Sequence, residues 1–229
     1  MPYDFSKEQE QSERKYGPVP AGSIVILEMQ VTQPNYGKDP ADPYITVAKS
    51  GLRQINCLFT VNRGTFEGEK FYQSITLPAA MQNINLSAGQ AKGCQIGGSQ
   101  IKAICQAASK PMQLASFGAM NGWKFPAKLR INRSRPFLTQ RGAVIWHNEI
   151  DRIITPSMPE YNAVRNAPFE IIEESGITGY DLTESEYDAL CAKAGYYPAD
   201  NSNDGYQGHD ADSNPFGDTQ PASFDDVPF

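Results

Sequence analysis

The chain has 229 residues, of which 40% are hydrophobic and 20% are charged. A chain of this length and composition can bury one hydrophobic core, which excludes a wholly disordered protein. It contains no apolar run of about 18 residues, the length of a membrane-spanning helix, and its first residues lack the apolar stretch of a signal peptide. The sequence therefore favours a cytoplasmic protein.

The formal net charge of −6 is divided unevenly along the chain. Residues 1–169 hold 19 Lys and Arg against 12 Asp and Glu, whereas residues 170–229 hold Lys193 alone against 14 acidic residues. The first part thus carries a charge of +7 and the second a charge of −13. No acidic residue occurs between Glu69 and Glu149. A basic body with an acidic end is typical of proteins that handle polyanions.

The first half of the chain predicts antiparallel strands, because apolar and polar residues alternate between turn signals. Order is expected to begin near Pro18. Strands are expected over residues 23–31, 44–49, 52–61 and 70–77. Ser50 and Gly51 join the second and third of these, and a two-residue connection of this type predicts a β-hairpin.

The second half adds helices and further strands. Apolar residues at helical spacing predict a helix over residues 99–109, which should pack on the sheet. Strands follow within residues 123–137 and over residues 143–150. A capping box of Thr183 and Glu186 opens a short helix that ends at Gly195.

These elements predict a mainly β fold, an OB-fold-like antiparallel barrel with one or two helices, although the pattern equally permits other β-rich folds. The tail is rich in Asp, Asn, Ser, Gly and Pro and cannot bury enough apolar surface to order itself. The expected organisation has four parts. They are a flexible arm (1–17), an OB-like domain (18–168), a short acidic helical extension (169–195) and a disordered acidic tail (196–229).

The residues that could support catalysis or bind a metal are few. The four cysteines form no Cys-x-x-Cys pair, so neither a zinc finger nor a disulfide framework is expected, and we expect no cofactor. His147, Glu149 and Asp151 could hold a metal if one strand carried all three, which leaves a metal-dependent nuclease as a distant alternative. The glycines at 93, 97 and 98 lack a following Lys-Ser/Thr pair, so we interpret them as part of a loop. We therefore expect no enzyme.

The final residues suit a protein-docking groove. Asp225 and Asp226 can meet a basic rim, while Val227, Pro228 and Phe229 supply apolar contacts and a carboxylate. This end resembles the acidic tip of bacterial and bacteriophage single-stranded DNA-binding proteins, which commonly finish in several Asp followed by Ile-Pro-Phe. The resemblance implies recruitment of replication and recombination proteins. A solvated acidic tail without a partner is the alternative.

A second resemblance covers residues 44–109. The Val-Ala-Lys-Ser-Gly segment at 47–51, the turn and strand at 62–77 and the helix at 96–109 are similar to those of phage-encoded proteins of recombination and replication modules. Some phage members bind single-stranded DNA. This resemblance implies a phage origin, and hence the host cytoplasm, but assigns no residue a role.

The stretch without acidic residues mixes bases with aromatics, as binding of single strands requires, because charge follows phosphates and flat rings stack on unpaired bases. Tyr72 lies on the polar face of its strand and is the better stacking candidate, whereas Phe125 shares the core face of its strand. Trp123 and Trp146 fit either role. The candidate DNA-binding residues are Tyr72, Trp123, Lys124, Lys128, Arg130, Arg133, Arg135, Arg141 and Trp146.

The sequence thus predicts a sequence-independent single-stranded DNA-binding protein of DNA replication and recombination. A strand-annealing recombination protein is the closest alternative, and a nuclease that uses His147 and Glu149 is the more distant one.

Overall fold

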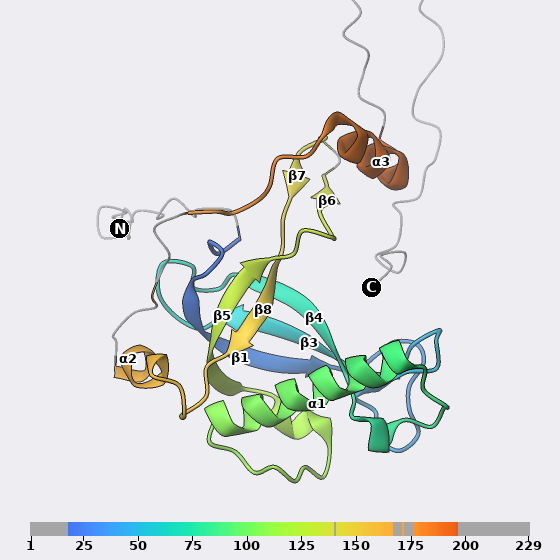
Figure 1. Ribbon diagram of the computed structural model, residues 1–229, viewed down its shortest axis with the longest axis vertical. Helices are drawn as coiled ribbons and strands as arrows, with labels where there is room; N and C mark the ends of the chain where they lie inside the picture. The colour runs from blue at the N-terminus through green and yellow to red at the C-terminus, as the bar shows by residue number, and fades with distance from the viewer. Residues whose placement is uncertain (1–17, 140, 167–170, 172–175, 197–229) are drawn as a thin grey trace, which may run out of the picture. The chain divides into compact units, whose positions relative to one another are not determined.

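Six antiparallel strands form the main sheet of the computed structural model, which describes residues 18–139, 141–166, 171 and 176–196 (Figure 1). The strands are β1 (Ile24–Thr32), β2 (Ile45–Val47), β3 (Arg53–Val61), β4 (Lys70–Thr76), β5 (Trp123–Ile131) and β8 (Asn148–Ile153). They follow the order β2-β3-β1-β5-β8, and β4 pairs with β3. The prediction of a mainly β, antiparallel fold is confirmed. The arm at 1–17 and the tail from 197, with its tip at 225–229, lie outside the described residues.

One face of the sheet forms the core, as the period-2 pattern predicts. In β3, for example, Ile55, Cys57, Phe59 and Val61 are buried, while the residues between them are half-buried. The Phe59 ring lies 5.4 Å from that of Phe71 and 6.1 Å from that of Phe125, the latter edge-on. Full burial of such a side chain contributes about 1.5–3 kcal/mol, so this face accounts for much of the stability of the sheet.

The predicted hairpin between β2 and β3 is present, but its connection is one residue longer than expected. The backbone N–H of Ala48 donates to the Leu52 carbonyl at 2.8 Å, which leaves residues 49–51 in the loop. Gly51 adopts a φ of 80° there. A glycine in the left-handed region is typical of three-residue hairpin loops.

The helix α1 (Ala88–Ala107) is longer than predicted and starts at a capping box of Ser87 and Gln90. The interpretation of Gly93, Gly97 and Gly98 as loop residues is wrong, because all three lie inside this helix. A Cβ built on Gly97 would lie 1.9 Å from the Thr76 carbonyl oxygen. Glycine at position 97 therefore allows the backbone of α1 to contact the backbone of β4. This contact outweighs the low helix propensity of glycine.

The sheet does not close into a hydrogen-bonded barrel among the described residues. The strands β4 and β8, which lie at opposite edges of the sheet, are linked by a side chain, because the Ile150 N–H donates to Oε1 of Gln73 at 2.9 Å. Helix α1 packs against both edge strands and against β5. The sheet is therefore curled, and the Gln73 side chain bridges the gap between β4 and β8.

The strand expected over 143–150 is divided in two. Val144–Ile145 (β7) pairs with Phe137–Leu138 (β6) as a separate two-stranded sheet, and β8 begins only at Asn148.

The helix α3 (Glu184–Ala194) has the predicted capping box and ends at Gly195 with a φ of 65°. A further short helix, α2 (Glu160–Asn166), was not predicted. The residues at 176–196 belong to the same compact unit as the main sheet. Among the described helices, none is long and apolar enough to cross a membrane.

A buried ion pair attaches the β1–β2 loop to β3. Nη2 of Arg53 lies 2.5 Å from the Asp39 carboxylate, and Nη1 donates to the Met81 carbonyl at 2.7 Å. The hydrogen bond from Arg53 holds the pKa of Asp39 below its usual range. The folded state thus gains stability above the ordinary Asp pKa of about 3.9, and this gain is lost as the pH falls through the lower folded value.

Asp39→Asn is expected to lower the free energy of unfolding at pH 7 by about 1–2 kcal/mol, since the amide still accepts a hydrogen bond but carries no charge. Urea unfolding from pH 7 to pH 3 measures the effect. The difference from the unmodified protein should shrink below pH 4, and Glu67→Gln, at an exposed position, is the control. A constant difference over the whole range would show that the charge on Asp39 contributes nothing.

Candidate nucleic-acid interface

The outer face of the sheet, opposite the core, carries an exposed tyrosine. Tyr72 of β4 pairs in register with Leu58 of β3, and its side chain is 60% exposed. Lys70 lies one row away, opposite Thr60. Because alternate residues of a strand share a face, these side chains form one surface over β3 and β4. Tyr72 thus lies where the sequence predicted it.

A network of amides and hydroxyls continues this surface toward β2. Oδ1 of Asn56 accepts hydrogen bonds from Ser74 Oγ at 2.8 Å and from Gln54 Nε2 at 3.4 Å. Nδ2 of Asn56 donates to Thr46 Oγ1 at 3.1 Å. The network crosses three strands and is uncharged, so it offers hydrogen-bonding groups to a base edge without attracting a phosphate.

The β1–β2 loop places a second aromatic ring beside β2. Tyr36 is 74% exposed, and the loop that carries it is attached where the Val47 N–H donates to the Gly37 carbonyl at 2.7 Å. Gly37 has a φ of 63°, and a Cβ there would lie 2.7 Å from the Val47 oxygen. Tyr36 is not among the predicted DNA-binding residues, and its signal in the sequence is an aromatic residue between turn residues in an otherwise polar loop.

The chain between β5 and β8 forms a basic hairpin, composed of β6, β7 and their flanking residues. Arg133, Arg135 and Arg141 are exposed there, and none forms a salt bridge within the part of the chain that the structure describes. Oδ1 of Asn132 accepts from the Ser134 N–H at 3.0 Å, which fixes the turn between the first two arginines. Phe137 pairs with Ile145, and both side chains are exposed, by 51% and 41%.

The predicted cations of β5 do lie on the outer side of their strand, but acidic residues of neighbouring strands pair with two of them. Nζ of Lys124 lies 3.3 Å from Glu28, and Nε of Arg130 lies 2.6 Å from Glu149. Lys128 pairs in register with Arg152 and is half-buried. Acidic residues of the neighbouring strands therefore lie next to the basic residues of β5. The net positive charge of the surface at β5 is lower than the sequence of this stretch suggests.

Both tryptophans are buried, each with 8% of its surface exposed. Trp123 belongs to the main core, whereas Trp146 lies against Gly179 and Tyr180. A Cβ on Gly179 would lie 2.3 Å from the Trp146 ring, so the chain lies directly against the indole. The structure thus gives both rings a packing role, and the exposed aromatic surface consists of other residues.

The residues of the nuclease alternative do not form a metal site. Glu149 and Asp151 both face Arg130, whose Nη1 lies 3.7 Å from the Asp151 carboxylate. Asp151 is the extra residue of a β-bulge, because Leu129 pairs with Ile150 and Lys128 with Arg152. Within the described ranges, no group of three His, Cys, Asp or Glu could hold a metal ion.

Comparison of the chain with protein-family models, with curated proteins and with solved structures finds no match.

Proposed function

We propose that the chain is a phage-encoded single-stranded DNA-binding protein, which binds DNA without sequence preference during replication and recombination. In this proposal the acidic tip at 225–229 recruits partner proteins, and the body holds the DNA. The two roles are separate, so each is open to its own test.

The strand order supports an OB-type body. Five strands, β1, β3, β4, β5 and β8, lie in the spatial order β4-β3-β1-β5-β8, with α1 between the third and fourth along the chain. An OB-fold is a five-stranded, partly open barrel that binds oligonucleotides on its second and third strands and on the loops after its first and fourth strands. The equivalent elements here are β3 and β4, the β1–β2 loop and the basic hairpin.

One observation carries the proposal: the three most exposed aromatic rings of the described residues lie on those three elements. They are Tyr36 in the β1–β2 loop, Tyr72 on β4 and Phe137 on the basic hairpin. An exposed ring lies unfavourably in water but stacks on an unpaired base, which contributes about 1–3 kcal/mol. Arg133, Arg135 and Arg141 then supply cations for the phosphates.

The proposal predicts a preference for single strands and a strong dependence on salt. Titration with labelled single-stranded and duplex DNA of the same length at several salt concentrations measures both. The logarithm of the affinity should fall with the logarithm of the salt concentration, with a slope of about −0.7 for each phosphate neutralised. Mixed-sequence and homopolymer strands should bind within a small factor of one another.

Equal affinity for duplex and single strand would overturn the proposal. Replacing Arg133 and Arg135 with Ala should reduce the slope, whereas Lys102→Ala on α1 is the control, because it removes one charge outside the three elements. Faster pairing of complementary strands would instead indicate a strand-annealing protein.

A further inference from the structure

Residues 177–196, far along the chain from the basic hairpin, are attached to it at its turn. The Tyr187 hydroxyl donates to the Gly142 carbonyl at 3.1 Å, and α3 packs against β6 (Figure 1). A Cβ on Gly142 would lie 2.6 Å from the Tyr196 hydroxyl. These contacts hold the turn between β6 and β7.

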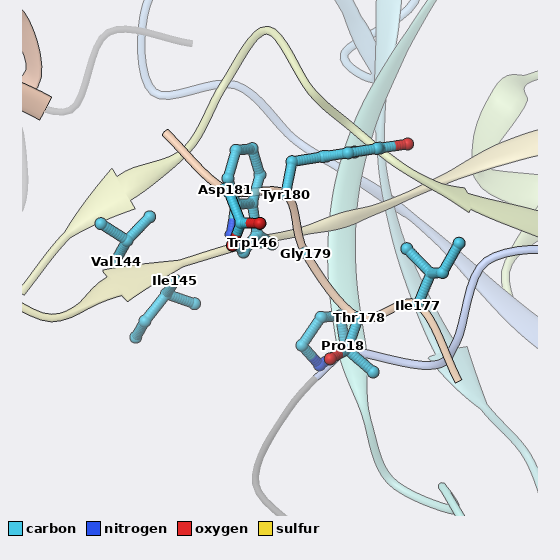
Figure 2. Close-up of a pocket in the computed structure, with 9 residues that line it drawn as sticks. All are labelled: Pro18, Val144, Ile145, Trp146, Ile177, Thr178, Gly179, Tyr180 and Asp181. Atoms are coloured by element: carbon cyan, nitrogen blue, oxygen red, sulfur yellow. The ribbon is translucent and has the colours of Figure 1, made fainter. Parts of the chain in front are cut away.

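The same segment is attached at the base of the hairpin through Tyr180. The Tyr180 ring meets the Trp146 ring edge-on at 5.5 Å, and the Arg133 guanidinium lies 5.3 Å from the centre of the Tyr180 ring. Figure 2 shows Tyr180 and Trp146 next to one another, with Gly179 in the chain beside them. One tyrosine therefore fixes the arginine that precedes β6 and contacts the tryptophan that follows β7.

The segment is also joined to the body of the protein. The Ala21 N–H donates to the Ile177 carbonyl at 2.7 Å, just before β1 begins. Residues 177–196 thus connect the residues just before β1 to the turn of the hairpin.

The hairpin needs this support. Among the described residues, its two strands share two register pairs, Phe137 with Ile145 and Leu138 with Val144, and the Thr139 N–H donates to the Ala143 carbonyl at 2.9 Å next to the turn. Isolated two-stranded hairpins are marginally stable in water at best. Leu138 is 5% exposed even though the Phe137 side of the hairpin is open to solvent. Helix α3 packs against β6, the strand that carries Leu138.

We infer that residues 177–196 are a brace, which holds the basic hairpin in the conformation that binds single-stranded DNA. Tyr180 and Tyr187 are the positioning residues, Tyr180 through Arg133 and Tyr187 through the hairpin turn. The DNA-binding part of this inference rests on the proposed function, whereas the brace itself does not. The charge of the segment alone would predict the opposite effect, which is weaker DNA binding through repulsion of the phosphates. The segment contains one basic residue, Lys193, and four acidic ones: Asp181, Glu184, Glu186 and Asp188.

The experiment compares four variants of the full chain: Tyr180→Leu, Tyr180→Phe, Tyr187→Phe and Asp188→Asn. Hydrogen exchange measures the protection of the hairpin amides, with no DNA present. Tyr180→Leu and Tyr187→Phe should exchange faster within the hairpin but not within β1, β3 or β5. Tyr180→Phe keeps the ring and should behave as the unmodified protein, and Asp188→Asn, at an exposed position of α3, should leave the hairpin protected.

The second readout is the affinity for a labelled oligothymidylate at several salt concentrations. Tyr180→Leu should weaken binding by about two- to fivefold, the range of an exposed cation–π contact, and should reduce the salt slope by about 0.7 if Arg133 loses its phosphate. In an Arg133→Ala background the same substitution should have a smaller effect on the affinity, because its contribution through Arg133 is already lost. A merely structural role would weaken binding equally in both backgrounds.

The outcomes separate the two hypotheses. Unchanged exchange in both Tyr180→Leu and Tyr187→Phe overturns the brace. Tighter DNA binding by Tyr180→Leu also overturns it, since the segment would then act as an acidic competitor. Faster exchange in a protein that binds no single strand supports the brace and overturns the proposed function.

Discussion

Gly97→Ala is expected to lower the free energy of unfolding by about 3 kcal/mol or more, which lowers the melting temperature of a protein of this size by about 6–12 °C. The new methyl group would lie 1.9 Å from the Thr76 oxygen and 2.8 Å from the Thr76 carbonyl carbon. Both are backbone atoms of the β4 strand, so no side chain can rotate away. Helix α1 must move off the sheet, which loses part of the core packing of Ile104 and Cys105.

Gly93→Ala is the matched control in the same helix. Nothing lies within 4 Å of a Cβ at Gly93, so the substitution should raise the free energy of unfolding by roughly 0.5–1 kcal/mol through helix propensity. Thermal and urea unfolding of the two variants measure the difference. Similar stability of both would contradict the close approach of α1 to β4.

The main sheet could be predicted from the sequence, because buried and exposed residues largely alternate in strands such as β3. The β-bulge beside Lys128 and the division of residues 143–150 into two strands could not be predicted in this way, since each depends on pairing with a distant part of the chain. The start of α1 was missed for a related reason. Glycine indicates a loop by its propensity, whereas at Gly97 the tertiary contact with Thr76 determines the structure.

The candidate interface was predictable only in part. Tyr72 followed from alternation, and Arg133 and Arg135 followed from the turn before Pro136. The ion pairs of Lys124 and Arg130 join residues on different strands, so a count of charges along the chain could not detect them. The packing role of Trp146 was not predictable either, because Gly179 and Tyr180, which lie against its ring, are more than 25 residues away along the chain.

Replacing Tyr72 with Ala is expected to weaken single-strand binding by about 1–3 kcal/mol, or roughly 5- to 150-fold in Kd. The ring is 60% exposed on the outer face of β4, so its loss removes a stacking surface and little core packing. Tyr36→Ala and Phe137→Ala should each have an effect in the same range or below it. Ile96→Ala is the control, because Ile96 is 52% exposed on α1, outside the proposed surface.

Fluorescence anisotropy of a labelled oligothymidylate measures these affinities, and thermal unfolding checks that each variant folds. Because both tryptophans are buried, DNA should change their emission little, in contrast to an exposed platform that a base would quench. An unchanged Kd for Tyr72→Ala, together with weaker binding by Phe137→Ala, would mean that the DNA binds to the basic hairpin alone. The outer face of β3 and β4 would then lie outside the DNA path, and the comparison with an OB-fold would lose its functional support.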